Sequence, residues 1–298
     1  MLAQYSDWLF IAAVVVYVLA MVLHAYAQAT LRTRTEVLVG ADLAAEPAPD
    51  ARADRFAGMG GSLAVLGALL HLASIATRGL ATGRWPIGNM YEFISIVTLA
   101  AVVTWLVMLR RTPGARAAAP WVLLLVVVLM TIAGTAIYTP AGPVMPALKS
   151  YWLPVHVTAI AISSGLLLVS GMASLLFLLR GWSRVPAPLA ERLPAADVLD
   201  RVAYRIMIVA FPLYTFAVVA GAVWAESAWG RFWGWDPKET VAFVAWVIYA
   251  AYLHARATAG WRTGRAAWVN VAGFATMIFN LFFINLVVAG LHSYAGVG

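Results

Sequence analysis

The stretch APWVLLLVVVLMTIAGTAIY, residues 119–138, contains no charged side chain. An α-helix rises 1.5 Å per residue, so about 20 residues cross the roughly 30 Å hydrocarbon core of a bilayer. In lipid, the backbone polar groups can be satisfied only within helices or closed barrels, and an unbroken apolar run favours the helix. Including 119–138, eight such segments occur, the others at about 8–30, 57–77, 91–109, 153–179, 206–225, 240–256 and 267–290. The sequence therefore predicts an all-α polytopic membrane protein with about eight transmembrane helices, forming one domain over residues 1–298.

The composition supports this class and excludes several kinds of chemistry. Hydrophobic residues make up 63% and charged residues 11% of the 298 positions, and the mean hydropathy is +0.85. A soluble domain is about a quarter charged. Cysteine is absent, so the chain has no disulfide, thiolate ligand or cysteine nucleophile, and any sulfur chemistry comes from a partner. The first apolar run lacks a preceding basic segment, so we expect the first helix to be retained rather than cleaved.

Basic residues alternate between the connectors, and this alternation predicts the orientation in the membrane. One set has 15 members: Arg32, Arg34, Arg52, Arg55, Arg110, Arg111, Arg116, Arg180, Arg184, Arg192, Arg201, Arg205, Arg256, Arg262 and Arg265. The other set has 5: Arg78, Arg84, Lys149, Arg231 and Lys238. The positive-inside rule puts the larger set in the cytoplasm. Both termini and residues 229–240 are then expected on the extracytoplasmic side of the cell membrane. The net charge of +7 reflects this orientation in the lipid bilayer and is no sign of nucleic-acid binding.

Two connectors carry expectations of their own. Residues 31–56 mix acidic and basic side chains with Ala and Pro, which favours a flexible loop. Residues 139–154 contain Pro140, Pro143, Pro146 and Pro154, which resist helix formation and indicate a fixed, extended lid.

The connector that begins at Arg78, RGLATGRWPIGNMYE, is unusually specific for a short link. One interpretation is a turn whose Trp85 and Tyr91 lie in the aromatic belt of the membrane interface. The other is that Arg78 or Arg84 faces a carboxylated ligand. The sequence leaves both open.

The stretch WGRFWGWDPKET, residues 229–240, is a polar and aromatic patch in an otherwise apolar chain. Its tail has the pattern of a helix start. Asp236 is a favoured N-cap, Pro237 suits the first helical position, and Glu239 completes a capping box. We therefore expect a helix to begin here.

Capping does not explain the tryptophans at the head of this patch. An interfacial belt supplies scattered aromatic residues, whereas Trp229, Trp233 and Trp235 fall within seven positions, with glycines between them. Those glycines allow close backbone approach, and indole faces offer a stacking surface. This combination favours a platform for a large planar ligand.

The five histidines are His24, His71, His156, His254 and His292. An ionisable side chain inside a membrane span is costly and is a functional candidate. His156 opens the fifth segment and His292 closes the eighth, so both fall at the level of the tryptophan patch. Either one alone fits a hydrated interfacial residue. As a pair beside three tryptophans, they favour axial ligation of haem iron.

The other histidines lie at different depths. His254 follows Asp236 by 18 residues, which is about 27 Å along a helix and near the cytoplasmic end. His24 is similarly deep, and His71 falls in the outer half of the second segment. The alternatives to ligation are hydrogen bonds between helices or, for His254, snorkelling near Arg256.

At this point the sequence resembles a known family. The stretch 229–240 is similar to the tryptophan-rich "WWD" signature of a haem-handling superfamily, and its Lys-Glu-Thr ending resembles the CcsA (ResC-type) branch of system II cytochrome c biogenesis. RWPIGNMYEF, YWLPVH and GLHSYAG extend the similarity over most of the chain. The resemblance implies that the loop 224–239 is the WWD loop.

The resemblance also implies roles for individual residues. His156 and His292 match the two external histidines that ligate haem iron, and His254 matches the membrane histidine that holds haem on its way outward. The signature positions that present haem for attachment are Trp229, Trp233, Trp235 and Asp236. Trp224 is expected to contact the haem, and the candidates to contact its propionates are Arg78, Arg84 and Arg231.

The activity implied is that of a cytochrome c haem lyase (synthase) subunit, which exports haem b and joins it to the Cys-X-X-Cys-His motif of apocytochrome c. The chain lacks a large outer domain, so a separate CcsB (ResB-type) partner is implied. The second ligand of the membrane-level haem is a partner residue or His24. Two alternatives remain open: a haem transporter or chaperone without attachment activity, and a b-type electron-transfer subunit.

Overall fold

The computed structural model describes residues 1–39, 51–112, 114–143, 150–258, 261 and 264–292. Within this part of the chain all regular structure is helical, and eight helices are long and apolar enough to cross a membrane. They are α1 (Leu2–Val39), α2 (Ala51–Thr82), α3 (Met90–Arg111), α4 (Ala119–Thr135), α5 (Trp152–Gly181), α7 (Ala196–Trp229), α8 (Pro237–Thr258) and α9 (Gly264–Phe279). Shorter elements are η1 (Ala115–Ala118), α6 (Ala187–Ala190) and η3 (Asn280–Ile284). The prediction of an all-α membrane protein with eight spans is confirmed.

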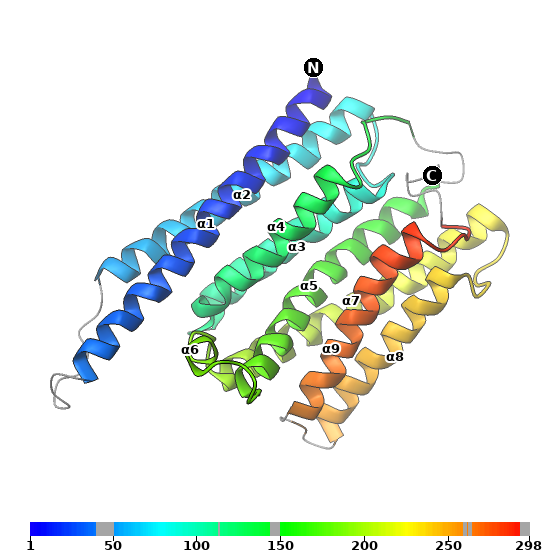
Figure 1. The fold of residues 1–298 in the computed structure, drawn as a ribbon. Helices are drawn as coiled ribbons and strands as arrows, with labels where there is room; N and C mark the ends of the chain where they lie inside the picture. Colours follow the sequence, from blue (N-terminus) through cyan, green and yellow to red (C-terminus); the bar gives the residue numbers. More distant parts are fainter. Residues whose placement is uncertain (40–50, 113, 144–149, 259–260, 262–263, 293–298) are drawn as a thin grey trace.

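The helices form a row of antiparallel pairs (Figure 1). The pair α1 and α2 is at one edge, α3 and α4 come next, α5 and α7 follow, and α8 and α9 form the other edge. The N-terminus, the loop between α7 and α8, and the end of η3 all lie at one end of the row, which we call the tryptophan end. We call the opposite end the far end.

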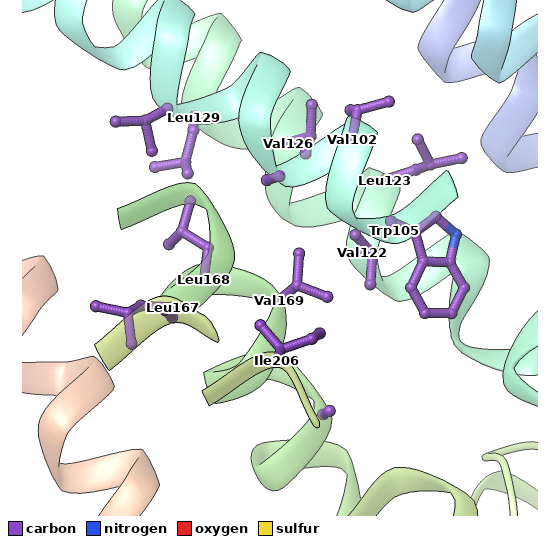
Figure 2. Close-up of a cluster of buried hydrophobic side chains, with 14 of the residues drawn as sticks. Val102, Trp105, Val122, Leu123, Val126, Leu129, Leu167, Leu168, Val169 and Ile206 are labelled. Atoms are coloured by element: carbon purple, nitrogen blue, oxygen red, sulfur yellow. The ribbon is translucent and has the colours of Figure 1, made fainter. Parts of the chain in front are cut away.

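The core lies where α3, α4, α5 and α7 meet. Figure 2 shows its side chains: Val102, Trp105, Val122, Leu123, Val126, Leu129, Leu167, Leu168, Val169 and Ile206. Because lipid is as apolar as these side chains, close packing rather than water exclusion holds such helices together. At Gly165 an added Cβ would lie 2.6 Å from the carbonyl oxygen of Val97. A glycine at this point is what lets α3 and α5 approach so closely.

A polar contact fixes α9 against α5 inside the apolar region. Asn270 is fully buried, and its Nδ2 donates to Ser170 Oγ at 3.0 Å and to Ser174 Oγ at 2.8 Å. Hydrogen bonds of this kind between helices stabilise packing in a membrane. These hydrogen bonds hold the first half of α9 beside α5.

Several connectors differ from the sequence expectations. The flexible loop expected over 31–56 is shorter, because α1 continues to Val39 and α2 begins at Ala51, and residues 40–50 lie outside the described chain. The last segment, expected to run to 290, changes at Asn280 into the π-helix η3. In the connector expected over 139–154, the described residues before 152 form no helix, as the prolines predict, but Pro154 lies in the first turn of α5. Pro146 and Lys149 lie outside the described residues, as does Arg262.

Candidate functional site

The tryptophan-rich stretch forms the turn between α7 and α8. Gly230 ends α7 with a left-handed φ of 71°, and its N–H donates to Glu226 O at 2.8 Å. Asp236 begins α8: its Oδ1 accepts the N–H of Lys238 at 3.0 Å. Glu239 Oε2 accepts the N–H of Asp236 at 3.2 Å and that of Gly234 at 2.9 Å. The predicted capping box is confirmed.

Asp236 also orients a histidine. His292 Nδ1 lies 2.9 Å from Asp236 Oδ1, and the N–H of Leu291 donates to Asp236 Oδ2 at 2.8 Å. Burial raises the pKa of Asp236, but the hydrogen bonds from His292, Leu291 and Lys238 outweigh this effect and lower it to about 2. Burial lowers the pKa of His292, although Asp236 opposes the change. A neutral imidazole therefore donates from Nδ1 to a carboxylate, and Nε2 carries the lone pair.

His156 reaches the same site from the first turns of α5. Its Nδ1 lies 2.8 Å from the carbonyl oxygen of Ala217 on α7, an acceptor that requires the Nδ1–H tautomer. An added Cβ at Gly221 would lie 2.7 Å from His156 Cε1, so the ring fits only beside a glycine. As with His292, Nε2 carries the lone pair.

Trp224 joins the two histidines into one cluster. Its ring is parallel to His156, with centroids 5.9 Å apart, and meets His292 edge to face at 5.8 Å. Trp229 lies 4.8 Å from Trp224 and 5.0 Å from His292, again edge to face. Trp224 is buried and Trp229 half-buried. Two imidazoles and two indoles, from three parts of the sequence, therefore meet at the tryptophan end.

A cavity opens beside this cluster. Its volume is about 170 Å³. The residues that line it include His156, His292, Trp224, Trp229, Trp233 and Lys238. Residues 87–90, just before and at the start of α3, also line it. Ligand pockets of this kind combine apolar and aromatic walls with a few convergent polar groups.

Among the predicted site residues of the tryptophan stretch, Arg231, Trp235 and Asp236 do not line the cavity. Trp235 is 65% exposed and has a left-handed φ of 57°, and its ring meets Trp233 edge to face at 5.8 Å. Arg231 Nη1 lies 3.8 Å from Glu239 Oε2. The side chains of Trp235 and Arg231 are at the rim of the turn.

The two arginines of the 78–92 connector face a carboxylate of their own chain. Glu92 Oε1 accepts from Arg78 Nε at 2.8 Å and from Arg84 Nη2 at 3.0 Å, while Oε2 accepts from Arg84 Nη1 at 2.8 Å and from the N–H of Gly88 at 2.7 Å. Arg78 Nη1 also lies 3.7 Å from Asp7 Oδ1 on α1. We call Asp7, Arg78, Arg84 and Glu92 the Glu92 cluster. The structure does not bring Arg78 or Arg84 into the cavity.

The remaining histidines lie away from this site. His254 is exposed, one turn before the end of α8 at the far end. His24 is buried on α1, where its ring packs on Gly60 of α2. Figure 1 shows α1 and α8 at opposite edges of the row, so His24 and His254 are not brought together. His71 is buried, with Nε2 2.8 Å from Ser95 Oγ.

Several polar residues of the cavity wall were not anticipated as site residues, among them Lys238, Asn280 and Asn285. Lys238 entered the sequence reasoning only as a charge, and Asn280 and Asn285 fell inside an apolar segment. The signal that points to the asparagines is that polar groups within a span face the protein interior or a cavity.

The pair of histidines suits a metal ion whose equatorial positions are already occupied by a planar ligand, so that the protein supplies only the axial ligands. Among the described residues, no group of three or more histidine or carboxylate side chains comes together to hold a bare metal ion. Two neutral imidazoles beside indole faces instead fit the axial positions and the plane of an iron macrocycle. The residues present therefore fit haem.

Comparison with known proteins points the same way. Residues 62–292 match the family model described as Cytochrome C assembly protein. The chain is 35% identical over 270 residues to a cytochrome c biogenesis protein CcsA of Synechococcus sp. (strain CC9605), covering 80% of this chain and 87% of the relative. A protein of the same name from Parasynechococcus marenigrum (strain WH8102) is 35% identical over 264 residues, covering 78% and 85%. One from Synechococcus elongatus is 35% identical over 274 residues, covering 76% and 84%.

Proposed function

The chain belongs to the cytochrome c assembly protein family and takes part in cytochrome c biogenesis, and from this premise we propose a haem-delivering subunit of a cytochrome c synthase. In this proposal the chain carries haem b to the tryptophan end and, with a CcsB-type partner, joins it to the Cys-X-X-Cys-His segment of apocytochrome c. The whole chain acts as one haem-handling domain. The tryptophan end faces the extracytoplasmic side of the cell membrane, as the distribution of arginine predicts.

One observation carries the proposal: His156 and His292 line one cavity, each with Nδ1 engaged by its own chain. An imidazole whose Nδ1–H is held in this way presents Nε2 to a metal, and its orientation is fixed before the metal arrives. Trp224 and Trp229 lie against the imidazole rings of the two histidines, and Trp233 lines the same cavity.

The chemistry of attachment sets the roles of the loop. Each thioether forms when a thiol S–H adds across a haem vinyl group, so that sulfur bonds to one carbon and hydrogen to the other, with no net oxidation or reduction. The tryptophans hold the macrocycle, and Asp236 positions His292. The histidine of the Cys-X-X-Cys-His segment then replaces one of the two axial ligands, which releases the product.

His254 has a separate role in this scheme. It lies on an exposed face at the far end of α8, and an ionisable side chain facing lipid is costly without a partner. We assign it to a first haem position, completed by a ligand from the CcsB-type partner. His24 does not serve as that ligand, because it lies at the other edge of the row.

The experiment is to purify the chain with its partner and compare His156→Ala, His292→Ala and His254→Ala. We expect loss of the bis-histidine haem spectrum for the first two variants, a smaller loss of bound haem for the third, and loss of cytochrome c for all three. Wild-type haem content and cytochrome c yield in all three variants would contradict the proposal.

The same preparation separates the other functions. Haem delivered to apocytochrome c without thioether bonds would indicate transport alone. Tightly held haem that cycles with quinol would indicate electron transfer. The latter needs stacked histidine pairs at both depths, and among the described residues only the pair at the tryptophan end is present.

A further inference from the structure

A polar cluster lies on one wall of the cavity, where the first turn of α8 meets η3. Lys238 Nζ donates to Asn285 Oδ1, and Asn285 Nδ2 donates to the carbonyl oxygen of Leu281 at 2.7 Å. Asn280 Nδ2 donates to the carbonyl oxygen of Lys238 at 3.3 Å. Lys238, Asn280 and Asn285 all line the cavity. The ammonium group is thus held in one position at the cavity wall.

The backbone around this cluster departs from a regular helix. Asn280–Ile284 forms a π-helix that continues directly from α9. π-Helical turns are rare and occur often at functional sites. Here Asn280, the first residue of the π-helix, and Asn285, the residue after it, both form hydrogen bonds with Lys238.

No carboxylate of the described chain forms an ion pair with Lys238. Among the described residues that line the cavity, Lys238 is the one lysine or arginine, and no carboxylate oxygen lies within 4.0 Å of its Nζ. Of the two neighbouring carboxylates, Glu239 also lines the cavity: its Oε2 accepts the N–H groups of Gly234 and Asp236, and its Oε1 has no hydrogen-bond partner among the described residues. Asp236 accepts from His292 and Leu291. Lys238 is half-buried, and a charge withdrawn from water is costly unless it is paired. An anion from outside the chain can supply that pairing.

The ammonium is also close to the iron-binding positions. Lys238, His156 and His292 line the same cavity. An anion bound to Lys238 therefore belongs to the same ligand that the histidines hold. Haem has two such groups, its propionates, and they lie on the edge of the macrocycle opposite the vinyl groups.

We propose that Lys238, held by Asn285, binds a propionate of the haem in the cavity and so selects which edge of the macrocycle faces α8. This inference rests on the proposed function, since it needs haem as the ligand. The contact fixes the propionate edge on the side of α8 and η3. The vinyl edge then faces away from α8 and η3.

The test compares two probes, haem and haem dimethyl ester, which keeps the iron and both vinyl groups but has no carboxylate. Affinities are measured by Soret titration of the purified protein. Wild type should bind haem about tenfold to a hundredfold more tightly than the ester, because one charge-assisted hydrogen bond raises affinity by about this factor. Lys238→Met should lower haem affinity to that of the ester and leave ester affinity and the bis-histidine spectrum unchanged. Lys238→Arg should retain the preference for haem.

The control is Arg201→Met, which removes one positive charge from an exposed ion pair with Asp197 at the far end and should keep the full preference. Equal binding of haem and ester by wild type overturns the inference without any variant. So does loss of the preference in Arg231→Met rather than in Lys238→Met. Wild type that binds neither compound overturns the proposed function itself, and with it this assignment.

Discussion

The Glu92 cluster and the His156–His292 cavity lie at the same end of the helix row, but they differ in how their polar and charged side chains are paired. In the Glu92 cluster both oxygens of Glu92 accept from arginine side chains and a backbone N–H, so the carboxylate is satisfied within the chain. In the cavity, Lys238 and two imidazoles line a space that is large enough for a ligand. Internal pairing, and not charge or depth alone, separates a structural cluster from a binding site.

The largest effect is expected at the Glu92 cluster. Glu92→Gln removes the charge from a fully buried side chain and leaves two arginines without their carboxylate. Breaking one partner of a buried ion pair costs about 3–5 kcal/mol. Denaturant or thermal unfolding in micelles measures the loss.

The matched control for Glu92→Gln is Asp197→Asn, which breaks the exposed pair with Arg201 and should cost about 0.3–0.5 kcal/mol. Folded Glu92→Gln protein should keep its haem spectrum. A changed axial ligation would make the Glu92 cluster part of the site and remove the contrast between the two regions.

The next effect concerns the cavity. Asp236→Asn keeps a good N-cap for α8 but replaces the carboxylate that accepts from His292 Nδ1. Loss of such an orienting partner lowers metal affinity about tenfold to a hundredfold. Haem titration should detect this decrease while the unfolding midpoint moves little. An equal loss of stability and affinity would indicate that Asp236 acts only as a cap.

A smaller effect is expected at Gly221. In Gly221→Ala the new methyl group meets His156 Cε1 at 2.7 Å, and overpacking of this kind costs about 1–3 kcal/mol. Haem affinity should fall as well, because the imidazole must move. Gly58→Ala is the control, since nothing lies within 4 Å of its added Cβ. Its helix should gain about 0.5–1 kcal/mol, and haem affinity measured alongside should not change.

The smallest effect is expected at Trp235. A left-handed backbone costs a non-glycine residue about 1–2 kcal/mol, so Trp235→Gly relieves strain at φ 57°. The variant also loses edge contacts with Trp233 and Phe243 at 5.8 and 6.1 Å, worth about 0.5–1.5 kcal/mol each. Stability should change by about 1 kcal/mol or less. Haem affinity should fall less than in Trp229→Gly, and an equal fall would bring Trp235 into the cavity wall.

Much of the fold could be predicted from local sequence patterns. Uninterrupted apolar runs predicted all eight spans, and the Asp236-Pro237-Lys238-Glu239 pattern predicted the start of α8, because each depends on neighbours in the chain. Depth counting also brought His156 and His292 to one level, although only the structure gives them a common cavity.

What the sequence could not give depends on contacts between distant segments. Arg84 resembled a propionate ligand because its true partner, Glu92, is found only when the connector is folded. No pattern in the apolar run from 267 predicts the π-helix. The sequence shows a lysine at position 238, but it does not show the cavity that this lysine lines.

The dispersal of the cavity wall along the sequence has a consequence for biosynthesis. Its parts come from residues 87–97, 153–164, 214–242 and 277–292, so the last contribution follows the eighth span. During translation, seven spans can enter the bilayer while the pocket still lacks His292. Under the proposed function, a nascent or truncated chain that ends before this histidine would lack one of the two haem ligands at the tryptophan end. The site proposed for attachment would therefore be complete only after the last span has been made.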